Sequence, residues 1–129
     1  MVAEARVWVD VEAAVREWAR DAGTSAERRV FFGYSDQAAQ PQLTLFRVSG
    51  PDDSCLIQFD AWARTKADAA SLAAELATAA DALGRYTFGG AVLHGAAVQD
   101  VRWQPDFEDN EPRYIVEVVF FAMADGLES

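Results

Sequence analysis

The sequence has little material for covalent cross-links or metal sites. It contains one cysteine, Cys55, and one histidine, His94. A disulfide within the chain is therefore excluded, and so are a cysteine-based zinc motif and a pair of histidine ligands. Cys55 lies in an apolar stretch and His94 in the middle of a strand-like segment, so we interpret both as ordinary strand residues. We expect no metal and no cofactor.

Long apolar runs and an excess of positive charge are also lacking. No run approaches the roughly 18 residues that a membrane-spanning helix needs. The first residues carry acidic groups where a secretion signal would have a basic region, which predicts a protein made and kept in the cytoplasm. The formal net charge is −10, and the 11 basic residues form no cluster. Because nucleic-acid-binding surfaces neutralise phosphates with basic side chains, we expect neither direct DNA or RNA binding nor attachment to an anionic membrane.

The negative charge is distributed unevenly. Residues 1–65 hold 7 basic and 10 acidic residues, whereas residues 66–129 hold 4 and 11. The densest cluster is the segment DFEDNE, whose acids are Asp106, Glu108, Asp109 and Glu111. Carboxylates bind Ca²⁺, but the spacing of the EF-hand loop is absent from the sequence. We interpret the cluster as a solvated acidic loop.

Sequence motifs of common enzyme classes are missing as well. No serine lies in G-x-S-x-G, and neither G-x-G-x-x-G nor G-x-x-x-x-G-K-[ST] occurs. Gly89 and Gly90 lie between a helical and a strand-like segment, so they do not build a phosphate site at the start of a helix. With 21 acids in the chain, spacing alone singles out no catalytic carboxylate pair. We expect no catalytic residues.

The chain does have enough apolar material for one domain core. It has 129 residues, of which 51% are hydrophobic, and we predict a single domain over residues 1–129. The segment 10–22 has apolar residues at helical spacing, with Asp10 as the N-cap and Gly23 as the stop signal.

A second, stronger helix is predicted over residues 66–83. Its apolar stripe is rich in alanine, which favours close packing against a sheet. Thr65 and Asp68 have the spacing of a capping box, and Gly84 follows as a terminal glycine.

The remaining segments have the residues and turn boundaries of strands. They are residues 29–34, 42–49, 55–63, 91–103 and 113–123. The resulting order, α-β-β-β-α-β-β, predicts an α+β two-layer sandwich: a mostly antiparallel sheet of about five strands with two helices on one face.

That architecture leaves one sheet face without cover. The segment 113–123 is apolar on both faces, and two helices can cover only one of them. The residues expected on the uncovered face are Leu56, Gln58, Asp60, Trp62, Ile115, Val119 and Phe121. Because large apolar patches are rare on soluble monomers, we expect another copy of the chain or another protein to cover this face.

Residues 57–73, IQFDAWARTKADAASLA, resemble the centre of phage tail terminator, or tail completion, proteins of the siphophage type. In that family a strand similar to v-q-i-D-v-W-a is followed by Thr or Ser and by an alanine-rich helix. The matching residues here are Gln58, Asp60, Trp62, Ala63, Thr65, Ala69, Leu72, Ala82 and Leu83. The flanks agree in layout: a V-F-F-G strand at residues 30–33, Pro41 in a loop, and a long strand that starts at Arg113 and Tyr114.

The resemblance implies a structural protein of the virion and no enzyme. Members form a ring, here expected to be a hexamer, that caps the finished tail tube, stops its polymerisation and joins the head–tail connector. The implied partners are other copies of the chain, the tube protein and the connector protein, at the tail–neck junction of the particle. In such a ring the acidic loop is expected to line the channel, where it would repel DNA instead of holding it.

Two alternatives stay open from the residues alone. In the first alternative, the chain is another neck, connector or tube component of the same tail. A tube subunit would differ from a terminator because it would polymerise without stopping at one ring. Alternatively it is a small cytoplasmic enzyme or ligand-binding α+β domain, dimeric, with a deep pocket that contains buried ionisable groups.

Overall fold

The structure is a computed structural model that describes residues 9–33, 41–108 and 110–125. The elements in chain order are α1 (Val11–Asp21), β1 (Val30–Phe32), β2 (Gln42–Ser49), β3 (Ser54–Trp62), α2 (Lys66–Asp81), β4 (Tyr86–Phe88), β5 (Ala91–Trp103) and β6 (Arg113–Ala124).

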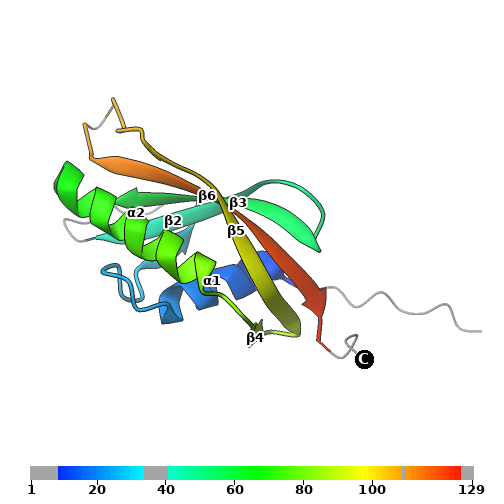
Figure 1. Cartoon of the computed structure of the whole chain (residues 1–129). Helices are drawn as coiled ribbons and strands as arrows, with labels where there is room; N and C mark the ends of the chain where they lie inside the picture. The colour runs from blue at the N-terminus through cyan, green and yellow to red at the C-terminus, as the bar shows by residue number, and fades with distance from the viewer. Residues whose placement is uncertain (1–8, 34–40, 109, 126–129) are drawn as a thin grey trace, which may run out of the picture.

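The strands form one curved sheet in the order β1-β2-β3-β6-β5-β4 (Figure 1). All neighbours are antiparallel except β1 and β2, which are parallel. The predicted α+β class and mostly antiparallel sheet are confirmed. The predicted number of strands was one too low, because Tyr86–Phe88 forms the short strand β4 before a turn at Gly89 and Gly90, whose φ angles are 58° and 82°.

Both helices begin as their capping residues predict. Asp10 accepts a hydrogen bond from the backbone N–H of Ala13 at 3.0 Å, and Thr65 accepts one from the backbone N–H of Asp68 at 3.1 Å. These bonds satisfy backbone donors that the first helical turn leaves unpaired. The prediction that Gly84 ends the second helix was wrong, since α2 already ends at Asp81 and its C-cap is Ala82, in a right-handed conformation with φ −91°.

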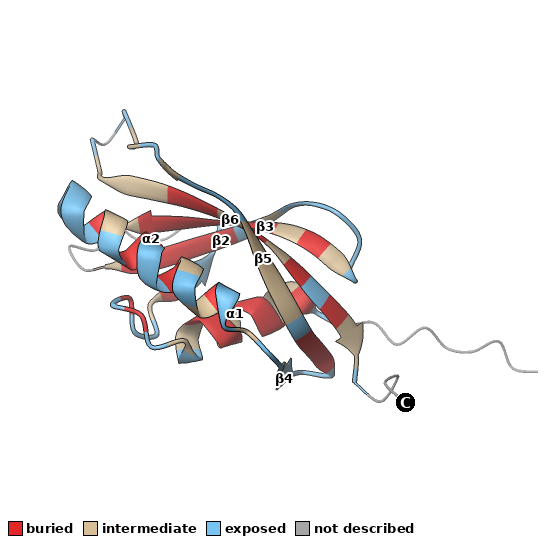
Figure 2. Ribbon diagram, in the orientation of Figure 1, coloured by how far each residue is buried: buried red, intermediate tan, exposed pale blue. Residues whose placement is uncertain are grey.

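The core lies between the two helices and one face of the sheet. On α1, Trp18 packs edge-on against Phe120 of β6, with ring centroids 5.3 Å apart. On α2, Leu72 and Leu76 are fully buried in the same cluster, and Figure 2 shows buried residues along the inner sides of both helices. The two helices therefore cover the same face, as predicted. Cys55 is also buried there, and this burial raises the pKa of its thiol.

No helix in the described part of the chain is long and apolar enough to cross a membrane.

Candidate interaction face

The sheet face opposite the helices, called the open face below, contains all seven residues predicted for it. The pairing of β3 with β6 sets them side by side, because alternate residues of paired strands point to the same side. The pairs are Leu56 with Val119, Gln58 with Glu117, Asp60 with Ile115, Trp62 with Arg113, and Ser54 with Phe121. The strand register therefore brings the predicted residues together.

The open face is less apolar than the sequence pattern predicts. Ile115 is only 1% exposed and Asp60 only 7%, so they offer little surface to a partner. Phe121, at one end of the face, is 36% exposed, and Trp62 is half-buried. The accessible surface therefore consists of apolar and aromatic margins around a polar centre.

A connected set of polar contacts forms that centre. The side-chain amide of Gln58 donates to Asp60 Oδ1 at 2.8 Å, and Arg113 Nη1 lies 3.6 Å from Asp60 Oδ2. The Arg113 guanidinium also lies over the Trp62 ring, 5.1 Å from its centroid. The Trp62 indole N–H donates to Thr44 Oγ1 at 3.0 Å. These contacts hold the Trp62 ring and the Asp60 carboxylate in defined positions across three adjacent strands.

The carboxylate of Asp60 is held in an environment that disfavours its charge. Burial raises its pKa above the usual value of 3.8, while the hydrogen bond from Gln58 and the charge of Arg113 act in the opposite direction. A buried carboxylate is costly unless hydrogen bonds and an opposite charge compensate it. Selection for stability alone would therefore not favour the Asp60 carboxylate at this position.

A second charged group lies on the β5 side of the same face. Arg102 Nη1 contacts Glu117 Oε1 at 2.5 Å and Asp100 Oδ2 at 2.7 Å. Arg102, Arg113 and the charged residues that pair with Arg102 were not predicted from the sequence as members of this face. The sequence does contain a signal for them, because they lie within predicted strands. The pairing of those strands places their side chains on the open face.

The acidic loop joins β5 to β6. Within it, the backbone N–H of Asp106 donates to the carbonyl of Glu111 at 3.1 Å, and the backbone N–H of Glu108 donates to Asp106 Oδ1 at 3.0 Å. Asp109, the fourth predicted acid, lies outside the described residues. Among the residues that are described, no group of three or more His, Cys, Asp or Glu side chains could hold a metal ion.

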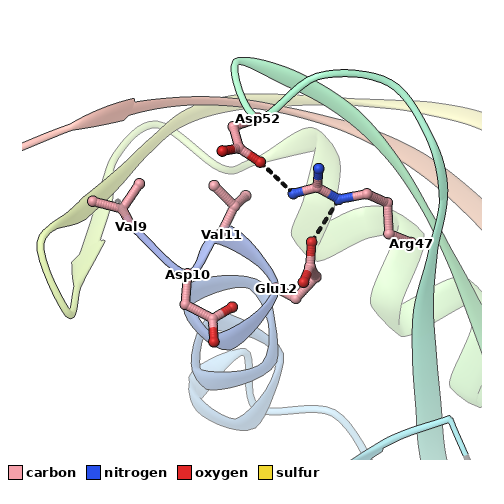
Figure 3. A pocket seen from close by; sticks show the side chains of 6 residues that line it. All are labelled: Val9, Asp10, Val11, Glu12, Arg47 and Asp52. Carbon is pink, nitrogen blue, oxygen red and sulfur yellow. Dashed lines mark hydrogen bonds and ion pairs between the residues drawn. The ribbon is translucent and has the colours of Figure 1, made fainter. Parts of the chain in front are cut away.

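A separate pocket of about 560 Å³ lies at the start of α1 (Figure 3). It is lined by Val9, Asp10, Val11, Glu12, Arg47 and Asp52. Arg47 is engaged there, with Nε 2.5 Å from Glu12 Oε1 and Nη2 2.7 Å from Asp52 Oδ1. These ion pairs tie α1 to the turn between β2 and β3. The arrangement stabilises the fold and gives the pocket an acidic character.

No model of a protein family matches the chain, and no characterised protein matches its sequence.

Proposed function

We propose that the chain is a tail terminator: a structural phage protein that closes into a ring on the end of the tail tube, stops tube growth and joins the connector. It acts by binding and not by catalysis. Its contacts with another subunit or with the tube lie on the open face, where Leu56, Gln58, Trp62, Val119 and Phe121 offer accessible surface and the buried Asp60 and Ile115 support them from below.

One observation supports this proposal most. Gln58, Asp60 and Trp62, the polar and aromatic residues of the terminator-like segment, meet on the open face within one set of contacts. Their neighbours Ile57 and Phe59 point into the core and are fully buried. The same strand thus supplies core residues on one side and a prepared surface on the other. A core role does not require Gln58, Asp60 and Trp62, whereas recognition of a partner does.

The composition of the face also suits a protein contact. Aromatic and arginine side chains are enriched at the centres of protein interfaces, and Trp62 lies beside Arg113 on this face. The charge of Arg113, which the buried Asp60 holds in place, favours one binding register, since a partner must match it.

The test uses the tail tube protein from the same genome. Tubes assembled from that protein alone are expected to grow without a fixed length, whereas tubes assembled with the chain should stay short and show a ring at one end in electron micrographs. Light scattering should give the free ring a mass near six times the 14.1 kDa of one chain.

Two results would contradict the proposal. Incorporation of the chain along the whole tube would favour a tube or connector component instead. A chain that stays monomeric and leaves the tubes unchanged would favour the small-domain alternative.

A further inference from the structure

Exposed hydrophobic side chains gather at the two opposite edges of the sheet. Among the described residues, nine large hydrophobic side chains are exposed, and seven of them belong to the four outermost strands. These seven are Phe31 and Phe32 on β1, Phe46 and Val48 on β2, Phe88 on β4, and Val101 and Trp103 on β5. Clusters of this kind mark contacts with other proteins more often than isolated exposed residues do.

The short outer strands β1 and β4 lie at opposite ends of the two sheet edges. On one edge, β1 covers only residues 43–45 of β2, near the end of the sheet where β6 begins. On the other edge, β4 covers only residues 91–93 of β5, near the end where β6 finishes. Among the described residues, each edge therefore has a short outer strand at one end and, at the other end, a strand segment without a strand beside it, called its recess below. Suppose that the β1–β2 edge of a second copy is set beside the β4–β5 edge of the first, with their strands aligned. Then β1 of the second copy lies at the recess of β5 of the first copy, and β4 of the first copy lies at the recess of β2 of the second.

The strand directions and the backbone allow this arrangement. Because β2, β3, β6 and β5 alternate in direction and β1 is parallel to β2, β1 of one copy runs antiparallel to β5 of the next. In the described part of the chain, residues 94–103 of β5 have no strand on their outer side. A long uncovered edge strand readily pairs with another chain.

Strand β1 contributes to the contact between copies mainly through its side chains, because both main-chain groups of Val30 are already hydrogen-bonded within the fold. The Val30 carbonyl accepts a hydrogen bond from Arg20 Nη2 at 3.0 Å, and the Val30 N–H donates to the Arg28 carbonyl at 2.9 Å. Phe32, which is 41% exposed, is on the helix-covered side of the sheet, and so is Val101, which is 43% exposed. In the aligned arrangement these two side chains come from different copies and lie on the same side of the joint.

The charges at one end of the joint are compatible. Arg28, whose side chain is 61% exposed, comes just before β1 and pairs within its own copy with Glu17 at 3.1 Å and Asp21 at 2.8 Å. The acidic loop with Asp106 and Glu108 comes just after β5, at the same end of the sheet. Aligned copies bring Arg28 toward a loop with excess negative charge, but because Glu17 and Asp21 already share its charge, the electrostatic contribution to this orientation is small and the orientation rests on the strand geometry.

We infer that copies of the chain join head to tail through these edges, with the β4–β5 edge of one copy against the β1–β2 edge of the next. A contact between two different surfaces of identical subunits generates a closed ring when the rotation closes. The inference rests on the proposed function in that it assigns the subunit contacts of the proposed ring. It leaves the open face free for the tube.

The test uses two variants that each block one edge with a charge. Phe32→Glu blocks the β1–β2 edge, and Arg16, whose guanidinium lies 4.4 Å from the Phe32 ring centroid, gives the new carboxylate a partner within the fold. Val101→Glu blocks the β4–β5 edge. Ser71→Glu adds the same charge at an exposed position on α2 and serves as the control. Thermal unfolding establishes that all three fold.

The expected result is a loss of assembly with specific rescue. Each edge variant should have the monomer mass of 14.1 kDa at concentrations where wild type and Ser71→Glu form the ring. An equimolar mixture of the two edge variants should form a one-to-one dimer and nothing larger, because each partner retains one functional edge.

The outcomes separate the joint from the function. If both edge variants keep the wild-type mass, or if their mixture stays monomeric, the edge joint is wrong, although the terminator proposal survives when wild type still caps tubes. If the edge variants behave as expected but wild type does not limit tube length, the joint stands and the proposed function fails. A wild type that stays monomeric, even with tubes present, overturns both.

Discussion

Asp60 and Arg113 face each other on adjacent strands with 3.6 Å between Oδ2 and Nη1, on a sheet face that neither helix covers. Asp60 is 7% exposed, and its burial raises its pKa although Arg113 and Gln58 oppose the shift. A carboxylate retained at some cost to the folded monomer suggests a role outside the monomer, because natural proteins often keep destabilising groups where function needs them.

Asp60→Asn tests this cost through its pH dependence. Below pH 3.8 Asp60 is protonated in both the folded and the unfolded chain; as the pH rises through the raised pKa of the folded state, stability is lost because the charge must be held in a buried site. The variant avoids this loss. It should therefore be more stable than wild type at pH 7, and the difference should shrink and vanish below pH 3.8. Denaturant unfolding at a series of pH values measures this, and a variant that is less stable at pH 7 would show that the ion pair outweighs the burial.

Trp62→Ala should weaken assembly more than folding. In the monomer the change removes one hydrogen bond to Thr44, worth about 1 kcal/mol, the contact with Arg113 and the packing of the buried part of the ring. At an interface centre, a buried tryptophan commonly contributes more than about 2 kcal/mol to binding. Trp62→Glu should bind even less well, because it places an unpaired charge in the contact.

Trp62→Phe provides the control, since it keeps an aromatic ring of smaller size and removes the indole N–H. The measurement compares capping of the tube with thermal unfolding for the three variants. Equal losses of binding and of stability would assign Trp62 to the fold alone.

The sequence predicted those elements that local chemistry determines. The helix that follows Thr65 begins at the predicted residue because its cap and its apolar spacing agree, and the strand at residues 42–49 matches β2 because turn residues bound it. The open-face side chains of β3 and β6 were predictable as well, since the period of two fixes them once both segments are strands.

Features that depend on distant contacts were not predictable. The strand at residues 86–88 is too short to show a period, although the Gly89–Gly90 pair after it is a recognisable hairpin signal. Nothing local determines that β1 pairs parallel to β2. The sequence pattern also assigned Ile115 to an accessible surface, whereas its surroundings bury it to 1% exposure.

Thr65→Ala should destabilise the fold without changing the open face. The Thr65 hydroxyl accepts the backbone N–H of Asp68 at 3.1 Å, and loss of such an N-cap costs about 1 kcal/mol. Thr65→Ser keeps the accepting oxygen and should restore most of this stability. Chemical denaturation of the three proteins measures the effect. An alanine variant as stable as wild type would show that packing of α2 on the sheet determines its start without the cap.

The acidic loop allows a test of DNA passage. Wild type should show no measurable binding to duplex DNA at physiological salt, because a ring of six copies would have a formal charge of −60 (6 × −10). Changing Asp106, Glu108, Asp109 and Glu111 to Lys should preserve the fold, since all four residues lie between β5 and β6, outside the helices and strands.

The charge reversal removes the hydrogen bond from the Glu108 N–H to the Asp106 carboxylate, so only the loop itself is expected to rearrange. If the loop lines the channel, four lysines per copy would bind the phosphate backbone and slow the passage of DNA, which would appear as reduced infectivity of otherwise complete particles. Changing the same four residues to Asn and Gln removes the charge without adding attraction, and should impair passage much less. Full infectivity of particles with all four lysines would place this loop outside the channel.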